Sequence, residues 1–152
     1  MLSHVWIPDL EMRTTYQAWC RQYKQTEVNR LGLVAAKAAY ESGDQWLADL
    51  LLVIAANEQM VRQQLQAAFP KIEVLPLEGT YLLWVDLRQV IAKERTKHVI
   101  QDIAGLAVDY GEWFSQDGQG LIRLNLATTP TIIQEALDRM IEAIKKEERH
   151  DD

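Results

Sequence analysis

Two stretches decide the fold that this sequence predicts: Glu78-Gly79-Thr80-Tyr81-Leu82-Leu83-Trp84-Val85-Asp86 and Gly120-Leu121-Ile122-Arg123-Leu124-Asn125. In both, a glycine is followed by leucine and β-branched residues, and the first stretch also contains Tyr81 and Trp84, which is typical of a strand entered through a turn. Residues 80–87 are apolar on both faces, so we expect a central strand there. The second stretch alternates between apolar and polar residues, which predicts a strand with one buried face.

Three helices are predicted upstream of these strands. Asp9 can cap the first, in which apolar residues recur at helical spacing. The second covers 27–42, and Gly43 is placed to terminate it. The third covers 44–69 and is stopped by Pro70. At 1.5 Å per residue it would be about 39 Å long, which is typical of a helix that connects two bodies.

With the remaining segments, the chain is predicted to combine helices and strands (α/β in the broad sense, α+β more narrowly). We expect a small mixed or antiparallel sheet covered by helices. Period-two patterns and turn residues separate the strands, and apolar stripes mark the helices. The segments that we expect are strands at 3–7, 72–74, 107–110 and 121–127, helices at 96–104 and 130–146, and a hairpin turn at 116–120.

Composition excludes several classes of protein. The chain has 152 residues, of which 48% are apolar, which is enough for one domain with a sizeable core. Its net charge of -6, without a long basic run, excludes nucleic acid and anionic membrane as partners. Cys20 is the only cysteine, so no intrachain disulfide forms, and we expect a cytoplasmic protein that does not cross a membrane.

Arg123 is the residue on which the chemistry concentrates. It shares the polar face of its predicted strand with Asn125, and its planar guanidinium matches a carboxylate in two parallel hydrogen bonds. Periodicity alone favours a simpler interpretation, in which Arg123 pairs with a neighbouring acid. The acids in question are Glu78, Asp86 and Asp109.

The other candidate residues have structural interpretations. His4, His98 and His150 are scattered without ligand spacing, so no metal site is predicted. Cys20 lies on an apolar stripe and is expected to be a buried structural thiol. The lysines are expected to be surface charges; they are Lys24, Lys37, Lys71, Lys93, Lys97, Lys145 and Lys146.

The aromatic residues near the strands are expected to belong to the core. Tyr81 and Trp84 lie on a strand that is apolar on both faces, which is more typical of a core than of a ligand pocket. Trp113 and Phe114 are interpreted in the same way.

The two stretches quoted above resemble the C-terminal part of a fold-type I pyridoxal-phosphate enzyme. The resemblance is closest to the branch of carbon–sulfur (cystathionine) β-lyases and aminotransferases that includes the maltose-regulon modulator proteins. Further segments agree in order and spacing over nearly the whole chain: Ile7-Pro8-Asp9, Asn29-Arg30-Leu31-Gly32-Leu33, Ala39-Tyr40-Glu41-Ser42-Gly43-Asp44-Gln45-Trp46-Leu47 and Trp113-Phe114.

The resemblance implies a role for Arg123. In this branch the arginine of a Gly-x-x-Arg-x-Asn strand binds the α-carboxylate of an amino-acid substrate, and Gly120 to Asn125 matches that pattern. The resemblance also implies a pyridoxal phosphate cofactor in the full-length family, held by a lysine that would precede Met1. We therefore assign no catalytic and no cofactor-binding residue here, and we expect this chain alone to bind no cofactor. The resemblance also implies that the loop of Trp113 and Phe114 lies near the substrate entrance.

The expected organisation follows from the same resemblance. Residues 1–43 correspond to the end of the large domain and its connecting helices, 44–148 to the C-terminal small domain, and 149–152 to a solvated tail. The favoured function is that of the C-terminal part of a lyase or aminotransferase, inactive alone and self-associating as a homodimer. The alternative is a free-standing, non-catalytic binding or interaction module derived from that domain.

Overall fold

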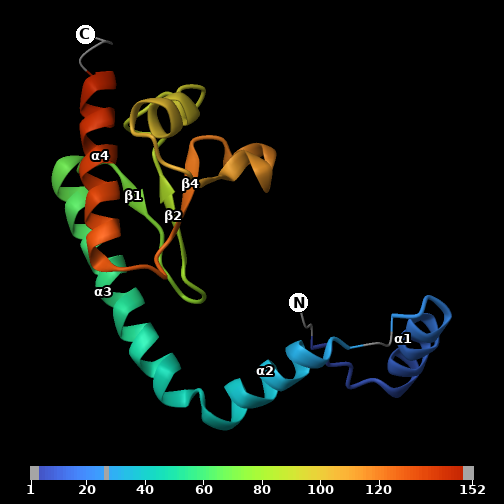
Figure 1. Ribbon diagram of the computed structural model, residues 1–152. Coiled ribbons are helices and arrows are strands. Elements are labelled where there is room, and N and C mark those ends of the chain that lie inside the picture. Colours follow the sequence, from blue (N-terminus) through green and yellow to red (C-terminus); the bar gives the residue numbers. More distant parts are fainter. Residues whose placement is uncertain (1–3, 26–27, 149–152) are drawn as a thin grey trace. The chain divides into compact units, whose positions relative to one another are not determined.

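A computed structural model describes residues 4–25 and 28–148, and the chain divides into two compact units, Met1–Ala48 and Asp49–Asp152. The first unit contains α1 (Leu10–Gln22) and α2 (Arg30–Ser42) (Figure 1). The predicted cap of α1 is confirmed, because Asp9 Oδ1 accepts a hydrogen bond from the Met12 backbone N–H at 2.7 Å. Asn29 caps α2 in the same way, accepting from the Gly32 N–H at 3.0 Å.

The first unit also corrects two expectations. Residues 4–8 form no strand, and Ser3 of the predicted strand at 3–7 lies outside the described residues. A strand needs a partner for its backbone groups, and the described sheet provides none for this segment. Helix α2 begins at Arg30 instead of residue 27, which also lies outside the described residues. The predicted tail at 149–152 is likewise not described.

Helix α3 (Asp44–Ala68) begins directly after Gly43, which is the C-cap of α2. The expected long helix is therefore confirmed, although it ends at Ala68 instead of residue 69. It ends just before Phe69, whose backbone N–H still donates to the Leu65 carbonyl at 2.8 Å. Within the described part of the chain, no helix is long and apolar enough to cross a membrane.

A four-stranded antiparallel sheet organises the second unit. It consists of β1 (Glu73–Val74), β2 (Leu82–Asp86), β3 (Asp109–Tyr110) and β4 (Leu121–Asn125), in the spatial order β1-β2-β4-β3. The expected central position of the strand within 80–87 is confirmed, because β2 pairs with β1 on one side and β4 on the other. All three pairings are antiparallel, so the antiparallel alternative holds.

Short helical segments connect these strands. The region predicted as a helix at 96–104 contains a π-helix, η1 (His98–Ile103), in which the Ala104 N–H donates to the Val99 carbonyl. Arg139 fixes its end by donating from Nε to the Ala104 carbonyl at 2.8 Å. The predicted turn at 116–120 instead contains a short 3₁₀ helix, η3 (Gln116–Gly118), preceded by another, η2 (Gly111–Trp113).

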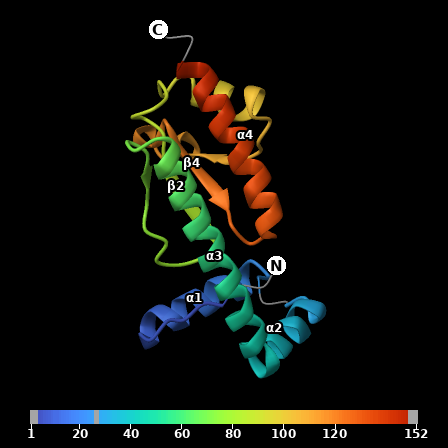
Figure 2. The same ribbon diagram turned by 90° about the vertical axis from the view of Figure 1, so that its left-hand side faces the viewer.

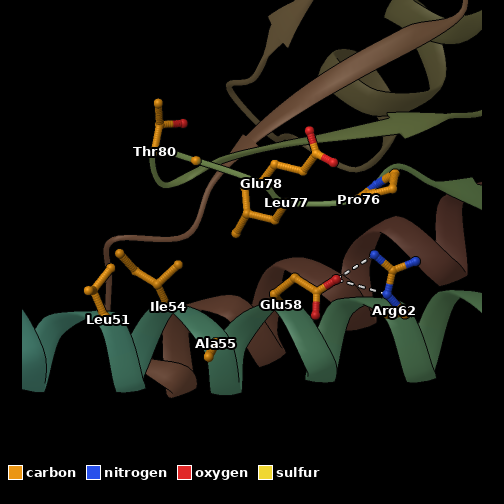
Figure 3. Close-up of a pocket in the computed structure, with 10 residues that line it drawn as sticks. Leu51, Ile54, Ala55, Glu58, Arg62, Pro76, Leu77, Glu78 and Thr80 are labelled. Carbon is orange, nitrogen blue, oxygen red and sulfur yellow. Dashed lines mark hydrogen bonds and ion pairs between the residues drawn. The ribbon is translucent and has the colours of Figure 1, made fainter.

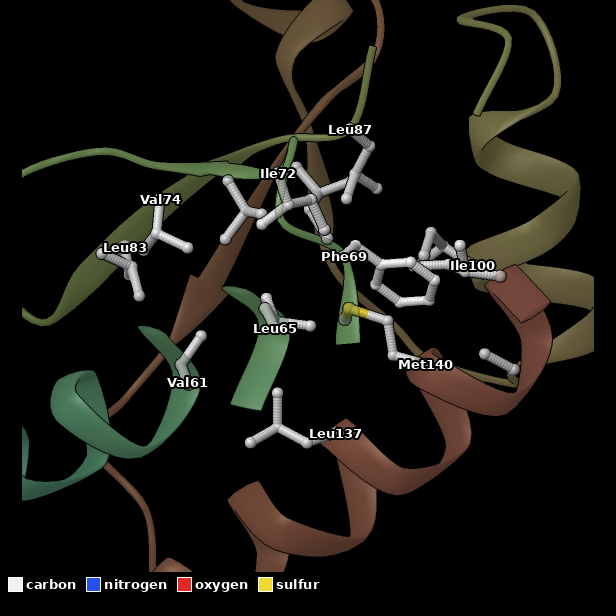
Figure 4. Packing of buried hydrophobic residues seen from close by; sticks show 14 of the residues in the cluster. Val61, Leu65, Phe69, Ile72, Val74, Leu83, Leu87, Ile100, Leu137 and Met140 are labelled. Atoms are coloured by element: carbon white, nitrogen blue, oxygen red, sulfur yellow. The ribbon is translucent and has the colours of Figure 1, made fainter. Parts of the chain in front are cut away.

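The core of the second unit lies between the sheet and the helices α3 and α4 (Pro130–Glu148), which cover the same face of the sheet (Figure 2). Gln64 on α3 and Gln134 on α4 join the two helices through paired side-chain amide hydrogen bonds of 2.6 and 3.0 Å. Figure 4 shows the packing. The largest fully buried side chains are Leu65, Leu83, Leu87, Ile100, Ile122, Leu126, Leu137, Met140, Ile144, Val61, Val85 and Val99.

A buried amide connects α3 to the end of β4. Asn57 is fully buried, and its Nδ2 donates to the backbone carbonyls of Leu126 and Thr128, each at 2.9 Å. These bonds satisfy two carbonyls in the segment that leads from β4 into α4. The polar side chain thereby fixes how α4 returns to the sheet.

Substitution of a core leucine in α3 should separate core packing from helix propensity. Leu65 is fully buried, so we expect Leu65→Ala to lower the free energy of unfolding by about 2–5 kcal/mol. Leu52 on the same helix is 71% exposed, so Leu52→Ala should change the free energy of unfolding by less than about 0.5 kcal/mol. Urea denaturation of both variants measures the difference, and equal effects would contradict the assigned core.

Candidate functional site

Arg123 lies on β4, on the face of the sheet opposite the core. The register places it directly across from Trp84 on β2 and from Asp109 on β3. Side chains on directly opposed residues of antiparallel strands lie close together, so these three residues form one row across the sheet. The Arg123 side chain is 22% exposed, so it is mostly but not fully buried.

The Arg123 guanidinium is held along one edge. Its Nε and Nη2 both donate to Oδ2 of Asp109, at 3.1 and 2.7 Å. A guanidinium has five N–H donors. Among the described residues, Nη1 and the second Nη2 hydrogen have no hydrogen-bond partner. These two terminal nitrogens form the end-on fork of the guanidinium, which can donate two parallel hydrogen bonds to one carboxylate.

The same guanidinium lies over two aromatic rings. Its central carbon lies 4.5 Å from the centre of the Phe114 ring and 5.5 Å from that of Trp84. The two rings also contact each other edge to face, with centres 5.4 Å apart. Aromatic faces attract cations at such distances, so the two rings stabilise the charge of the guanidinium and limit where it can move.

Two glycines place Phe114 over the sheet. The loop that carries it folds so tightly that a Cβ built on Gly111 would lie 2.2 Å from the Gly118 carbonyl oxygen. The reciprocal distance, from Gly118 to the Gly111 carbonyl oxygen, is also 2.2 Å. Only glycine permits this backbone approach, and the residues between the two glycines, Phe114 included, are folded back against β4 as a result.

The three acids considered as partners of Arg123 have different positions. Asp109 makes the ion pair, whereas Asp86 is occupied by Arg88, whose Nε lies 2.9 Å from its Oδ1. Glu78 is exposed.

The expectation that Tyr81 belongs to the core is wrong, since it is 43% exposed, and Trp84 is only half-buried. Trp84 lies on the face of β2 that is opposite the core, whereas Tyr81 precedes the first residue of the strand.

A separate cleft of about 500 Å³ lies between α3 and the loop at 76–80 (Figure 3). Leu51, Ile54 and Leu77 make it largely apolar, and Arg123 does not line it. Arg62 on α3 crosses one end, pairing with Glu58 and donating from Nη1 to the Val74 carbonyl at 2.7 Å. Because its donors are used within the protein, this arginine holds the fold together and offers no second carboxylate site.

The lysines and Cys20 agree with their structural interpretations, whereas the expectation that Trp113 and Phe114 belong to the core is wrong, because they are 61% and 55% exposed. All seven lysines are exposed, and Cys20 is buried, as expected. Among residues 4–25 and 28–148, no group of three or more histidine, cysteine or acidic side chains could hold a metal ion. The Nδ1 atom of His98 instead lies 2.9 Å from Oδ2 of Asp102, four residues further along the chain.

The small antiparallel sheet, covered by helices on one face and carrying a strand arginine on the other, has the aminotransferase-like fold. Cystalysin from Treponema denticola, whose crystal structure contains a pyridoxal 5'-phosphate cofactor, matches it with a TM-score of 0.82. The two are 28% identical, over 92% of this chain and 36% of cystalysin. No family model matches the chain.

Curated sequences give the same relationship. A Mycobacterium leprae protein assigned to the cystathionine beta-lyases is 32% identical over 129 residues, which cover 76% of this chain and 32% of the relative. Protein MalY of Escherichia coli is 28% identical over 76% of this chain and 30% of its own length. The chain is therefore similar to part of the pyridoxal-phosphate-dependent carbon–sulfur lyases and aminotransferases, as its motifs predict. It spans about a third of the length of these relatives.

The Asp86–Arg88 pair generates a prediction on acid stability. Hydrogen bonds from Arg88 lower the pKa of Asp86 below its ordinary value, although burial opposes the shift. A carboxyl whose pKa is lower in the folded state stabilises the protein above its unfolded-state pKa of about 3.9. That contribution is lost as the pH falls through the folded-state pKa.

We therefore expect Asp86→Asn to lower the free energy of unfolding at neutral pH and to flatten its decline in acid. Denaturant unfolding between about pH 7 and pH 3 measures both effects. Glu135→Gln, at an exposed position on α4, is the control and should keep the wild-type slope. A wild-type slope in Asp86→Asn would contradict the assignment.

Proposed function

We propose that this chain is the C-terminal part of a pyridoxal-phosphate-dependent carbon–sulfur β-lyase or aminotransferase that acts on amino acids, and that Arg123 binds the substrate carboxylate. The observation that carries the proposal is the free end-on fork of Arg123, on a rigid strand and beside two aromatic rings. A carboxylate bound there would accept two parallel charged hydrogen bonds, which fixes both its position and its orientation.

The proposed domain boundaries follow the family resemblance. We propose that residues 44–148 are the small domain and that 1–43 join it to the rest of the enzyme. Large apolar side chains of the first unit support this proposal because they are exposed here, among them Trp6 at 90%, Leu31 at 80% and Tyr40 at 78%. Another protein surface would have to cover them. Self-association as a homodimer stays a prediction.

The described residues do not fit pyridoxal phosphate by themselves. The cofactor requires a lysine amine, and all seven lysines lie exposed, whereas the contacts of Arg123 are a carboxylate and two aromatic rings. We therefore propose that the lysine and the phosphate site belong to sequence outside this chain. The part played by these residues is then to bind and orient the substrate.

Acetate tests the role of Arg123 without requiring activity. We expect acetate to shift the indole N–H resonance of Trp84 in a saturable way, because that ring lies against the guanidinium. Arg123→Gln should weaken this binding at least about ten-fold, since it removes a charged pair of hydrogen bonds. Arg21→Gln, on α1, makes the same change of charge and should leave it unchanged. Acetate binding that survives Arg123→Gln would refute the proposed role.

Absorbance spectroscopy tests whether this chain is inactive alone. After incubation with pyridoxal phosphate, exposed lysines should form only weak, reversible aldimines, whose absorbance disappears on dialysis. We also expect no release of thiol from cystathionine. A stoichiometric adduct that survives dialysis would show that the chain carries its own cofactor site, contrary to the proposal.

A further inference from the structure

The surroundings of Arg123 lead to an inference that rests on the proposed function. We propose that Asp109 is a positioning residue, which holds the guanidinium by its side edge so that the end-on fork faces the substrate carboxylate. Asp109 would not touch the substrate. Its effect would be to give Arg123 selectivity for a planar carboxylate over other anions.

The first step of the argument is the edge that Asp109 occupies. One oxygen, Oδ2, accepts from both Nε and Nη2, at 3.1 and 2.7 Å, so the carboxylate lies beside the guanidinium and not at its end. An acid at the end-on fork would compete directly with a substrate carboxylate for the same donors. From the side, Asp109 leaves both terminal nitrogens able to donate outwards.

The second step is that the guanidinium is fixed in more than one direction. The side-edge pair restricts its rotation within its own plane, and the Phe114 ring, whose centre lies 4.5 Å from the central carbon, blocks its movement toward that ring. A free arginine side chain populates many rotamers, and ordering them opposes binding. Here the ordering is present before any ligand binds, which is the condition for geometric selectivity.

The third step distinguishes positioning from charge. Asp109 is negative, so by its charge alone it weakens the binding of every anion at Arg123. Loss of that charge should therefore strengthen acetate and chloride binding together. Loss of positioning acts differently, because only a planar ligand with two acceptor atoms needs the fork to be oriented. The ratio of acetate to chloride affinity separates the two effects.

Arginine side-chain NMR of the 152-residue chain tests whether Asp109 holds Arg123. In the wild type we expect a slowly exchanging Nε–H signal from Arg123, and in Asp109→Asn at least a five-fold faster exchange. The matched control is Glu112→Gln, an exposed position in the same loop that removes an equal charge, and it should keep the wild-type rate. Equal exchange in the wild type and Asp109→Asn would overturn the positioning role.

Titrations of the same variants with sodium acetate and sodium chloride test selectivity. We expect the wild type and Glu112→Gln to share one acetate-to-chloride affinity ratio, and Asp109→Asn to lower it about three- to ten-fold. An unchanged ratio in Asp109→Asn would overturn the inference while leaving the proposed function intact. If Arg123→Gln retains the full acetate affinity, the proposed function fails instead, and the inference fails with it.

Discussion

The pairing of β2 with β4 is the constraint on which the rest of the second unit depends. Five consecutive residue pairs hold the two strands in register, from Leu82 opposite Asn125 to Asp86 opposite Leu121. Because side chains alternate along a strand, this register sends Leu83 and Ile122 into the core and leaves Trp84 and Arg123 together on the other face. A slip of one residue would exchange the two faces, so core packing and the candidate site are specified together.

Local sequence signals predicted most of the elements that surround this pair. Asp9 predicts the start of α1 because its side chain satisfies a free backbone N–H, and that bond forms. The two-sided apolar pattern of residues 80–87 predicts a central strand, and β2 is one. Residues 4–7 of the strand predicted at 3–7 do not form one, because an apolar run becomes a strand only where a partner strand lies beside it.

The candidate site depends on contacts that local patterns do not encode. The alternation of apolar and polar residues along β4 predicts that Arg123 points away from the core. It does not predict which of the three acids, at different distances along the chain, pairs with Arg123. The choice of Asp109 comes from the register of β3 against β4. Phe114 reaches the guanidinium only because Gly111 and Gly118 approach closely, a contact seven residues apart that no periodic pattern marks.

The bond from Arg62 to the Val74 carbonyl also bears on how this protein avoids aggregation. Val74 belongs to β1, an outer strand of the sheet, and outer strands offer unpaired carbonyls to the strands of other molecules. A guanidinium reaching across from α3 occupies that acceptor with a charged donor that no incoming backbone can easily displace. Intermolecular growth of the sheet is thereby disfavoured at β1, and β3 is left as the edge at which another strand could add.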